Sequence, residues 1–369
     1  MWNHPNRNFG LDAIRALAII LVVLSHCTYI LPEFNLQLTN GIRLLGATGV
    51  DIFFVLSGFL IGGILLRKLE AGQTSFSDLV HFWKRRWLRT LPNYFVVLIL
   101  NVIIIFFLRN TLVDNIWMYV PFLQNFVTTH PDFFTEAWSL SIEEYAYIIL
   151  PFLIYSSFLF FSKTNTSKAF LYTTVLVIFI LFIFKIQFYN SSEIKTYNDW
   201  SSQFRKVVLY RLDAIYYGFV MVYLVSKYKF FKKNSLLLLV VGAVLFLNLH
   251  TIIVLFDVMP DDFKLFYSVF YLPLISISIA LVFPYFLKLK ANDNLNKIIQ
   301  YISTRSYAIY LVNYSLVLLT LLKFLEPSVF FVFIYLIVTF VISELLYRWI
   351  ELPVLKLRNR LVPRDHKKH

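Results

Sequence analysis

Two ionisable residues bracket an apolar run near the beginning of the chain, in the segment IRALAIILVVLSH. Arg15 and His26 are eleven residues apart, so on an α-helix they lie within roughly 20° of one face and about 16 Å apart along the axis. A neutral imidazole can accept a proton from a hydroxyl group, and a guanidinium can bind a phosphate. The pair therefore predicts a base and an anion-binding group at opposite ends of one helix. The alternative interpretation is an arginine that reaches the lipid headgroups and a histidine that is hydrogen-bonded in the core.

Carboxyl groups also occur in apolar surroundings. Asp51 stands at the start of DIFFVLSGFLIGG, where a helix N-terminus alone could account for a negative charge. Glu143 and Glu144 lie in AWSLSIEEYAY. Adjacent residues on a helix diverge by about 100°, so these two glutamates face different directions and at least one needs a partner or a proton.

Two further segments carry clustered charges. Arg86 and Arg89, in HFWKRRWLRTLP, are three residues apart, and two guanidinium groups on one helical face suit an anionic ligand such as a phosphate. The alternative interpretation is that these arginines form a basic cytoplasmic flank, which only sets the orientation of the helices in the membrane. Arg211 and Asp213, in RLDAIYYG, lie near the outer surface, where a mutually neutralising pair is the simpler of two interpretations and a functional role is the other.

The composition indicates which elements must position these residues. Of 369 residues, 59% are hydrophobic and only 15% are charged, and the mean hydropathy is +0.69. A soluble domain has about 25% charged residues, so this chain belongs in a lipid bilayer. The net charge of +13 is then explained by basic cytoplasmic loops rather than by nucleic acid. The single cysteine, Cys27, excludes a disulfide framework and a cysteine-rich metal site, and we expect no metal.

The hydropathy pattern predicts an all-α polytopic membrane protein of about ten transmembrane helices, with both termini in the cytoplasm. The stretch 116–127 is too short to span and is expected to be interfacial or re-entrant. We expect one transmembrane domain over 1–355 and a basic cytoplasmic tail over 356–369. Gly58, Gly62 and Gly63 form a small-residue face that favours close helix packing. The expected helices are 12–31, 45–66, 91–109, 137–161, 168–186, 207–226, 234–256, 265–287, 306–324 and 328–348.

In this arrangement His26, Asp51, Glu143, Arg211 and Asp213 all fall in the outer half. The arginines at 15, 86 and 89 fall on the cytoplasmic side. The sequence thus predicts an outer acid–base cluster and an inner arginine cluster.

These segments resemble the integral-membrane acyltransferase type 3 family, which includes bacterial O-antigen and peptidoglycan O-acetylases. The resemblance covers nearly the whole chain in order, and its first two segments are highly specific together. It rests on GLDAIRALAIILVVLSH (10–26), GVDIFFVLSGFLI (49–61), RRWLR (85–89), AWSLSIEE (137–144), RLDAIYYG (211–218) and RWIELP (348–353).

The resemblance implies a multi-pass protein of the bacterial cytoplasmic membrane. Its activity would be transfer of an acyl group, often acetyl, from cytosolic acyl-CoA to a hydroxyl of an envelope glycan or lipid-linked saccharide. By position, His26 matches the family's essential histidine and Arg15 its paired arginine. Arg86 and Arg89 match the pair linked to acyl-CoA binding, and Glu143 occupies the first glutamate position of its segment.

We therefore expect His26, assisted by Glu143 or Asp51, to act as the general base on the acceptor hydroxyl. The three arginines would hold the phosphates of acyl-CoA, which is a co-substrate rather than a tightly bound cofactor. The separation of Arg15 and His26 is comparable to the reach of a pantetheine arm. Direct transfer and a covalent acyl-enzyme both remain open. The supporting or substrate-binding residues are expected to be Trp138, Ser139, Glu144, Arg211 and Asp213.

The sequence departs from the family pattern in places. Asn313 stands where many relatives have histidine, so no second catalytic histidine is expected there, and Tyr145 replaces a common glutamine. We expect no appended extra-cytoplasmic hydrolase-like domain, so acylation would need the membrane core alone or a separate extra-cytoplasmic partner. A polytopic transporter of glycans or acyl groups is the rival interpretation. The absence of repeated halves counts against it.

Overall fold

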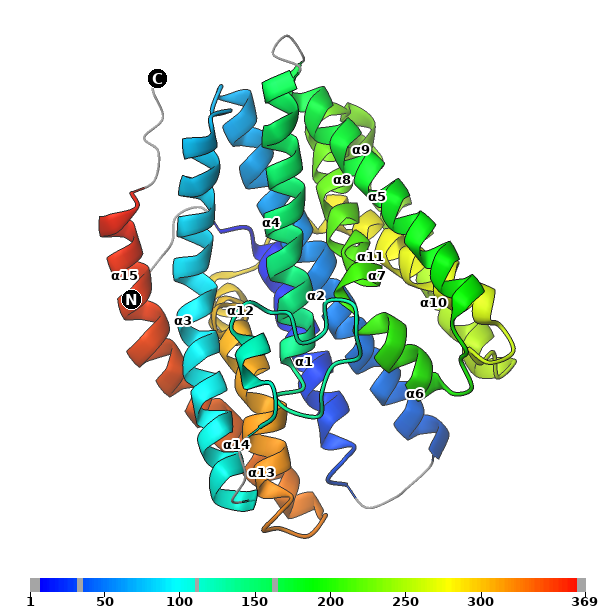
Figure 1. The fold of residues 1–369 in the computed structure, drawn as a ribbon, viewed down its shortest axis with the longest axis vertical. Helices are drawn as coiled ribbons and strands as arrows, with labels where there is room; N and C mark the ends of the chain where they lie inside the picture. The colour runs from blue at the N-terminus through cyan, green and yellow to red at the C-terminus, as the bar shows by residue number, and fades with distance from the viewer. Residues whose placement is uncertain (1–6, 32–35, 110–112, 161–164, 364–369) are drawn as a thin grey trace.

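A computed structural model describes residues 7–31, 36–109, 113–160 and 165–363, and these form an all-helical bundle (Figure 1). Nine of its helices, within the described residues, are long and apolar enough to cross a membrane. The longer elements are α1 (Phe9–Cys27), α2 (Leu36–Glu70), α3 (Phe76–Arg109), α4 (Ala137–Phe160), α5 (Thr166–Ser191), α8 (Asp213–Lys227), α10 (Ser235–Leu255), α11 (Leu272–Phe286), α12 (Asp293–Val312), α14 (Val329–Leu346) and α15 (Leu352–Leu361).

Short helical pieces complete the chain, several of them π-helical. They are η1 (Ile116–Tyr119), α6 (Tyr197–Trp200), η2 (Ser201–Arg205), α7 (Val208–Arg211), α9 (Lys229–Lys233), η3 (Phe266–Tyr271), η4 (Asn313–Leu318), α13 (Leu319–Leu321) and η5 (Tyr347–Glu351).

The expected helix at 306–324 lies within a continuous helical path through α12, η4 and α13. The first half of α12 is polar, and for this reason it is not among the nine apolar spans. The second half of α12 also carries polar side chains, and Ser303, Thr304, Ser306, Tyr307 and Tyr310 line a cavity. A membrane helix that borders a polar cavity does not need to be apolar all round.

Helix α3 begins fifteen residues before the expected start of the third span. Arg86 and Arg89 therefore lie on a helix rather than in a loop, and Arg86 is ten residues, or about 15 Å, beyond the first residue of α3. This extension carries the two guanidinium groups into the bundle.

Helices α2 and α8 pack closely, as the small-residue face predicted. A Cβ atom on Gly58 would lie 1.8 Å from the carbonyl oxygen of Ile215, and one on Gly218 would lie 2.2 Å from that of Val55. Only glycine allows two helix backbones to approach so closely. The contact holds the centre of α2 against α8, so the side chains on the opposite side of α2 have a fixed position.

Figure 1 shows α15 lying beside α3 at one edge of the bundle and α10 at the other edge, with α1, α2 and α12 between them. Helix α15 spans the expected boundary between the domain and the basic tail. Residues 364–369 lie outside the described part of the chain.

The predicted interfacial stretch 116–127 consists of η1 followed by irregular backbone. It packs inward, since Tyr119 is buried and its carbonyl accepts a hydrogen bond from the Tyr94 hydroxyl at 2.8 Å. Asn125 donates to the carbonyl oxygens of Trp138 and Lys206 at 3.0 and 2.7 Å. The stretch thus joins α3, the beginning of α4 and the chain before α7.

Candidate active site

A cavity of about 510 Å³ opens among α1, α2, α3, α4 and α12. Five arginines and three carboxylates contribute to its lining, an excess of two positive charges. The charged lining residues are Arg7, Asp12, Arg15, Arg67, Arg86, Arg89, Glu143 and Glu351.

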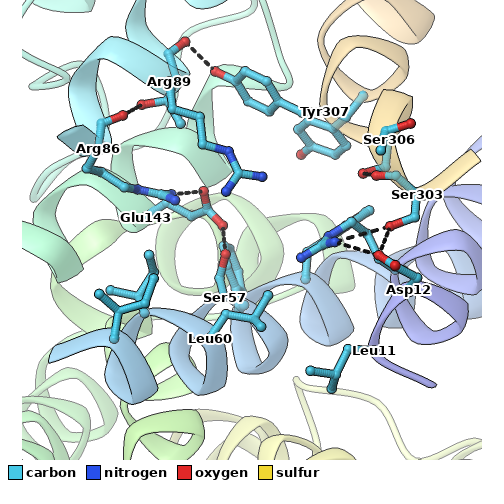
Figure 2. A pocket seen from close by; sticks show the side chains of 18 of the residues that line it. Leu11, Asp12, Ser57, Leu60, Arg86, Arg89, Glu143, Ser303, Ser306 and Tyr307 are labelled. Atoms are coloured by element: carbon cyan, nitrogen blue, oxygen red, sulfur yellow. Dashed lines mark hydrogen bonds and ion pairs between the residues drawn. The ribbon is translucent and has the colours of Figure 1, made fainter. Parts of the chain in front are cut away.

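Asp12 and Ser303 fix the position of Arg15. The Nη1 atom of Arg15 lies 3.2 Å from Asp12 Oδ1 and 3.1 Å from Ser303 Oγ, and Ser303 itself donates to Asp12 at 2.6 Å. Arg7 also pairs with Asp12, whose side chain is 5% exposed. A single buried carboxylate thus holds two guanidinium groups at one side of the cavity, where Figure 2 shows Asp12 beside Ser303.

Glu143 holds Arg86 on the facing side. Arg86 Nη2 lies 3.2 Å from Glu143 Oε2, and the Ser57 hydroxyl donates to Glu143 Oε1 at 2.6 Å. The guanidinium of Arg86 also stacks over the ring of Tyr147, 3.9 Å from its centroid. Figure 2 shows the guanidinium of Arg89 pointing into the cavity beside this pair.

The expected place of Glu143 in the outer cluster is wrong, because the structure places it among the arginines. The reason is that α3 rises further into the bundle than expected and meets Glu143 in the second turn of α4. Glu144 faces away, as the helical geometry predicted, and accepts a hydrogen bond from Thr90 at 3.0 Å.

The predicted pairing of Arg211 with Asp213 is wrong. Arg211 Nη2 lies 2.5 Å from Asp51 Oδ1, and Lys185 Nζ lies 2.5 Å from Asp213 Oδ2. Arg205 also approaches Asp51, at 3.8 Å. The two residues at 211 and 213 face different neighbours because residues two apart on a helix point about 200° away from each other, and Leu212 between them keeps helical backbone angles.

Lys185 and Arg205 are the members of these pairs that sequence reasoning missed. Lys185 is a single cation in the middle of an apolar span and is 1% exposed. An isolated intramembrane charge of this kind is itself a signal that a partner exists. Arg205 lies over the ring of Trp138, 5.2 Å from its centroid, and donates to the carbonyl of Ala47 at 3.1 Å.

His26 and Arg15 both contact side chains of the helical path formed by α12 and η4. Its Nδ1 atom lies 2.5 Å from Oδ1 of Asn313, and its ring centroid is 4.6 Å from that of Tyr314. Arg15 contacts Ser303, ten residues earlier, so both ends of α1 face the path formed by α12 and η4. The predicted common face of Arg15 and His26 is confirmed.

Neither expected carboxylate is among the described hydrogen-bond partners of His26. Glu143 binds Arg86 and Ser57, and Asp51 binds Arg211. The cavity lining reaches Ser139 and Tyr310, whose hydroxyl groups are 2.6 Å apart. Asn313, which contacts His26, follows Tyr310 by three residues, or about 4.5 Å of helix rise. The cavity therefore ends about one helical turn from Asn313.

Comparison with known proteins identifies the chain. An acyltransferase domain family model matches residues 8–348. The chain is 26% identical over 370 residues to the peptidoglycan O-acetyltransferase OatA of Listeria monocytogenes, covering 94% of this chain and 56% of that protein. It is also 26% identical over 380 residues to the O-acetyltransferase OatA of Staphylococcus aureus, covering 94% and 57%.

The chain thus spans little more than half the length of these relatives. No solved structure matches it. The family match covers most of the chain, including both ends of α1, Asn313 and every residue that lines the cavity except Arg7 and Glu351. The protein is a multi-pass membrane protein that belongs to the acyltransferase 3 family.

Proposed function

We propose that this protein transfers an acyl group, acetyl in the first instance, from cytosolic acyl-CoA to a hydroxyl of a cell-surface glycan. The observation that carries the proposal is the arginine-lined cavity, which ends one helical turn from the residue that contacts His26. The O-acetyltransferases that the chain resembles give the reaction class. The rival transporter interpretation offers no comparable reason for placing a histidine beyond an anion-binding cavity.

The inner end of the cavity suits the phosphates of acyl-CoA. The guanidinium groups of Arg15, Arg86 and Arg89 come from two facing helices, and each offers a planar fork of donors that matches a phosphate. Asp12 and Glu143 fix two of these groups before the donor arrives. Such preorganisation reduces the entropy lost on binding.

In this proposal Glu143 positions Arg86, and it is not the partner of His26. Asp51 holds Arg211 in the buried charged layer near the outer side, and Lys185 and Asp213 belong to the same layer. The pantetheine arm would extend along the polar face of α12, from Ser303 to Tyr310. The hydrogen-bonded Ser139 and Tyr310 close the far end of the cavity, and the thioester passes them to reach His26.

His26 then acts as the general base. Nε2 accepts the proton of the acceptor hydroxyl while the hydroxyl oxygen attacks the thioester carbonyl carbon. The carbon–sulfur bond breaks, the thiolate of CoA leaves, and the imidazolium returns the proton to sulfur. The products are the O-acyl glycan and CoA, and His26 is regenerated.

We place the protein in the bacterial cytoplasmic membrane with both termini inside. The arginine-lined end of the cavity then faces the cytosol, where acyl-CoA is made, and His26 lies toward the envelope. The acceptor is an envelope glycan or a lipid-linked saccharide. A separate extra-cytoplasmic partner could deliver it or pass the acyl group onward.

Consumption of acyl-CoA by purified protein in lipid nanodiscs tests this proposal. With a soluble glycan fragment as acceptor, the wild-type protein should release free CoA thiol and form the acylated fragment in equal amounts. An intact thioester in the presence of a range of glycan acceptors and acyl chains would favour a transporter.

A further inference from the structure

Asn313 is the described hydrogen-bond partner of His26, and its amide group is held in one orientation. The Nδ2 atom of Asn313 donates to the carbonyl oxygens of Ile309 and Tyr310, at 3.0 and 2.7 Å. Its Oδ1 atom faces His26 Nδ1 at 2.5 Å and lies 3.4 Å from the hydroxyl of Tyr335. The side chain is 0% exposed, so water cannot replace any of these partners.

The orientation of the amide determines which nitrogen of His26 carries a proton. Carbonyl oxygens only accept hydrogen bonds, so the amide nitrogen must face Ile309 and Tyr310. A reversed amide would place Oδ1 against two other oxygens and leave both of its donors without those acceptors. Since Oδ1 can only accept, Nδ1 of His26 must donate, and the lone pair of the neutral imidazole is then on Nε2.

A change in helix geometry places Asn313 where it can do this. The α-helical path changes to the π-helical segment η4 at Asn313 itself, and such segments are frequent at functional sites. The backbone amides of Tyr314 and Ser315 donate to Glu136 Oε1, at 3.1 and 2.7 Å, and the Ser315 hydroxyl also bonds to Glu136. A buried carboxylate at the start of α4 thus anchors the turn that holds Asn313.

We propose that Asn313 is a positioning residue that fixes the Nδ1–H tautomer of His26 and so directs Nε2 toward the acceptor hydroxyl. The proposal rests on the proposed function of His26 as the general base. It replaces the expected carboxylate partner with a neutral amide. A carboxylate beside His26 would add another charge that the bilayer makes costly, and the amide avoids this cost while still orienting the ring.

A neutral partner also suits the proton transfer. A carboxylate would stabilise the imidazolium and hold the proton on the histidine. An amide oxygen stabilises it less, so the imidazolium can pass its proton on to the leaving thiolate. The described aromatic neighbours of His26 are the rings of Tyr29 and Tyr314, so these contacts bring no carboxylate to the imidazole.

Two nearly isosteric substitutions test the proposal. Asn313→Leu fills the same space and removes the acceptor oxygen, whereas Asn313→Asp keeps an oxygen facing Nδ1. ¹⁵N NMR of histidine-labelled protein in nanodiscs reports the protonated nitrogen directly, and the resonances lost in His26→Ala assign the signal. We expect an Nδ1–H signal in wild type and in Asn313→Asp, and an Nε2–H or mixed signal in Asn313→Leu.

Kinetics then show whether the tautomer matters. We expect kcat of Asn313→Leu to fall by about 10²-fold, the scale of a general-base contribution, with an unchanged KM for acyl-CoA and partial recovery in Asn313→Asp. A wild-type His26 protonated on Nε2 would overturn the proposal. An intact kcat in a folded Asn313→Leu protein with a changed tautomer would overturn it as well. Full transferase activity in His26→Ala would refute the proposed function of His26. The NMR result would still decide the tautomer of His26 in the wild-type protein.

Discussion

Glu143 on α4 and Arg86 on α3 form an ion pair 3.2 Å apart, and the Ser57 hydroxyl on α2 donates to the same carboxylate. Three helices are thus joined at one side chain beside the cavity. In the proposed function, Glu143 therefore serves the binding of the donor and takes no part in the chemistry at His26.

Replacing Glu143 with glutamine tests this assignment. Glu143→Gln keeps the shape and an oxygen for Ser57 but removes the charge that holds Arg86. We expect KM for acyl-CoA to rise by about tenfold, equivalent to about 1.4 kcal/mol, while kcat changes much less. Steady-state kinetics in nanodiscs measure both constants. A collapse of kcat with an unchanged KM would show that Glu143 acts on the reacting groups.

Removing Arg89 tests the role of the arginine cluster. Its guanidinium points into the cavity, and Arg89→Ala leaves the pair of Arg86 and Glu143 in place. A hydrogen bond to a charged group contributes about 1.5–3 kcal/mol, so we expect acyl-CoA binding to weaken by tenfold or more. Isothermal titration calorimetry with CoA measures the affinity.

The matched control is Arg360→Ala. Arg360 is an exposed arginine of α15 and does not line the cavity. Its removal should leave the affinity within experimental error. Equal losses in both variants would mean that general positive charge, rather than a defined site, attracts the donor.

The contact of α2 with α8 predicts a large effect from a single methyl group. Gly58→Ala places a Cβ against the backbone of Ile215, which cannot move aside without shifting α8. Overpacking of this kind costs about 1–3 kcal/mol, so the apparent Tm in detergent should fall by several degrees. Gly41→Ala, on the same helix with nothing within 4 Å of the new Cβ, should not lower it. If the two variants had the same Tm, the close approach of α2 and α8 would be wrong.

The buried pair of Lys185 and Asp213 predicts non-additive effects on stability. Asp213→Asn leaves Lys185 charged and without its partner, a situation that costs about 3–5 kcal/mol. Adding Lys185→Met removes the stranded charge and should restore most of the thermal stability. A double variant as unstable as the sum of the two single variants would show that the two groups do not interact in the folded protein.

Several features of the site could be predicted from the sequence because they depend on spacing within one helix. Arg15 and His26 share a face of α1, and Glu143 and Glu144 diverge, since both follow from the 3.6-residue repeat. The small-residue face around Gly58 predicted a close helix contact for a similar local reason.

Features that depend on contacts between distant segments could not be predicted in this way. The partner of His26 is 287 residues away, and nothing local marks Asn313 as that partner. Arg211 and Asp213 are close in sequence, but their partners, Asp51 and Lys185, come from other helices. How far Arg86 lies inside the bundle depends on where α3 begins. Hydropathy located only the apolar second half of α3.

The most direct measurement is mass spectrometry of envelope glycans from a deletion strain complemented with wild-type protein, His26→Ala or His250→Ala. His250 is a half-buried histidine of α10 that bonds to the carbonyl of Phe246, so His250→Ala is a matched control. We predict that an acyl mass lost in the deletion returns with wild type and His250→Ala but not with a stably expressed His26→Ala protein. An acyl pattern fully restored by His26→Ala would contradict the account.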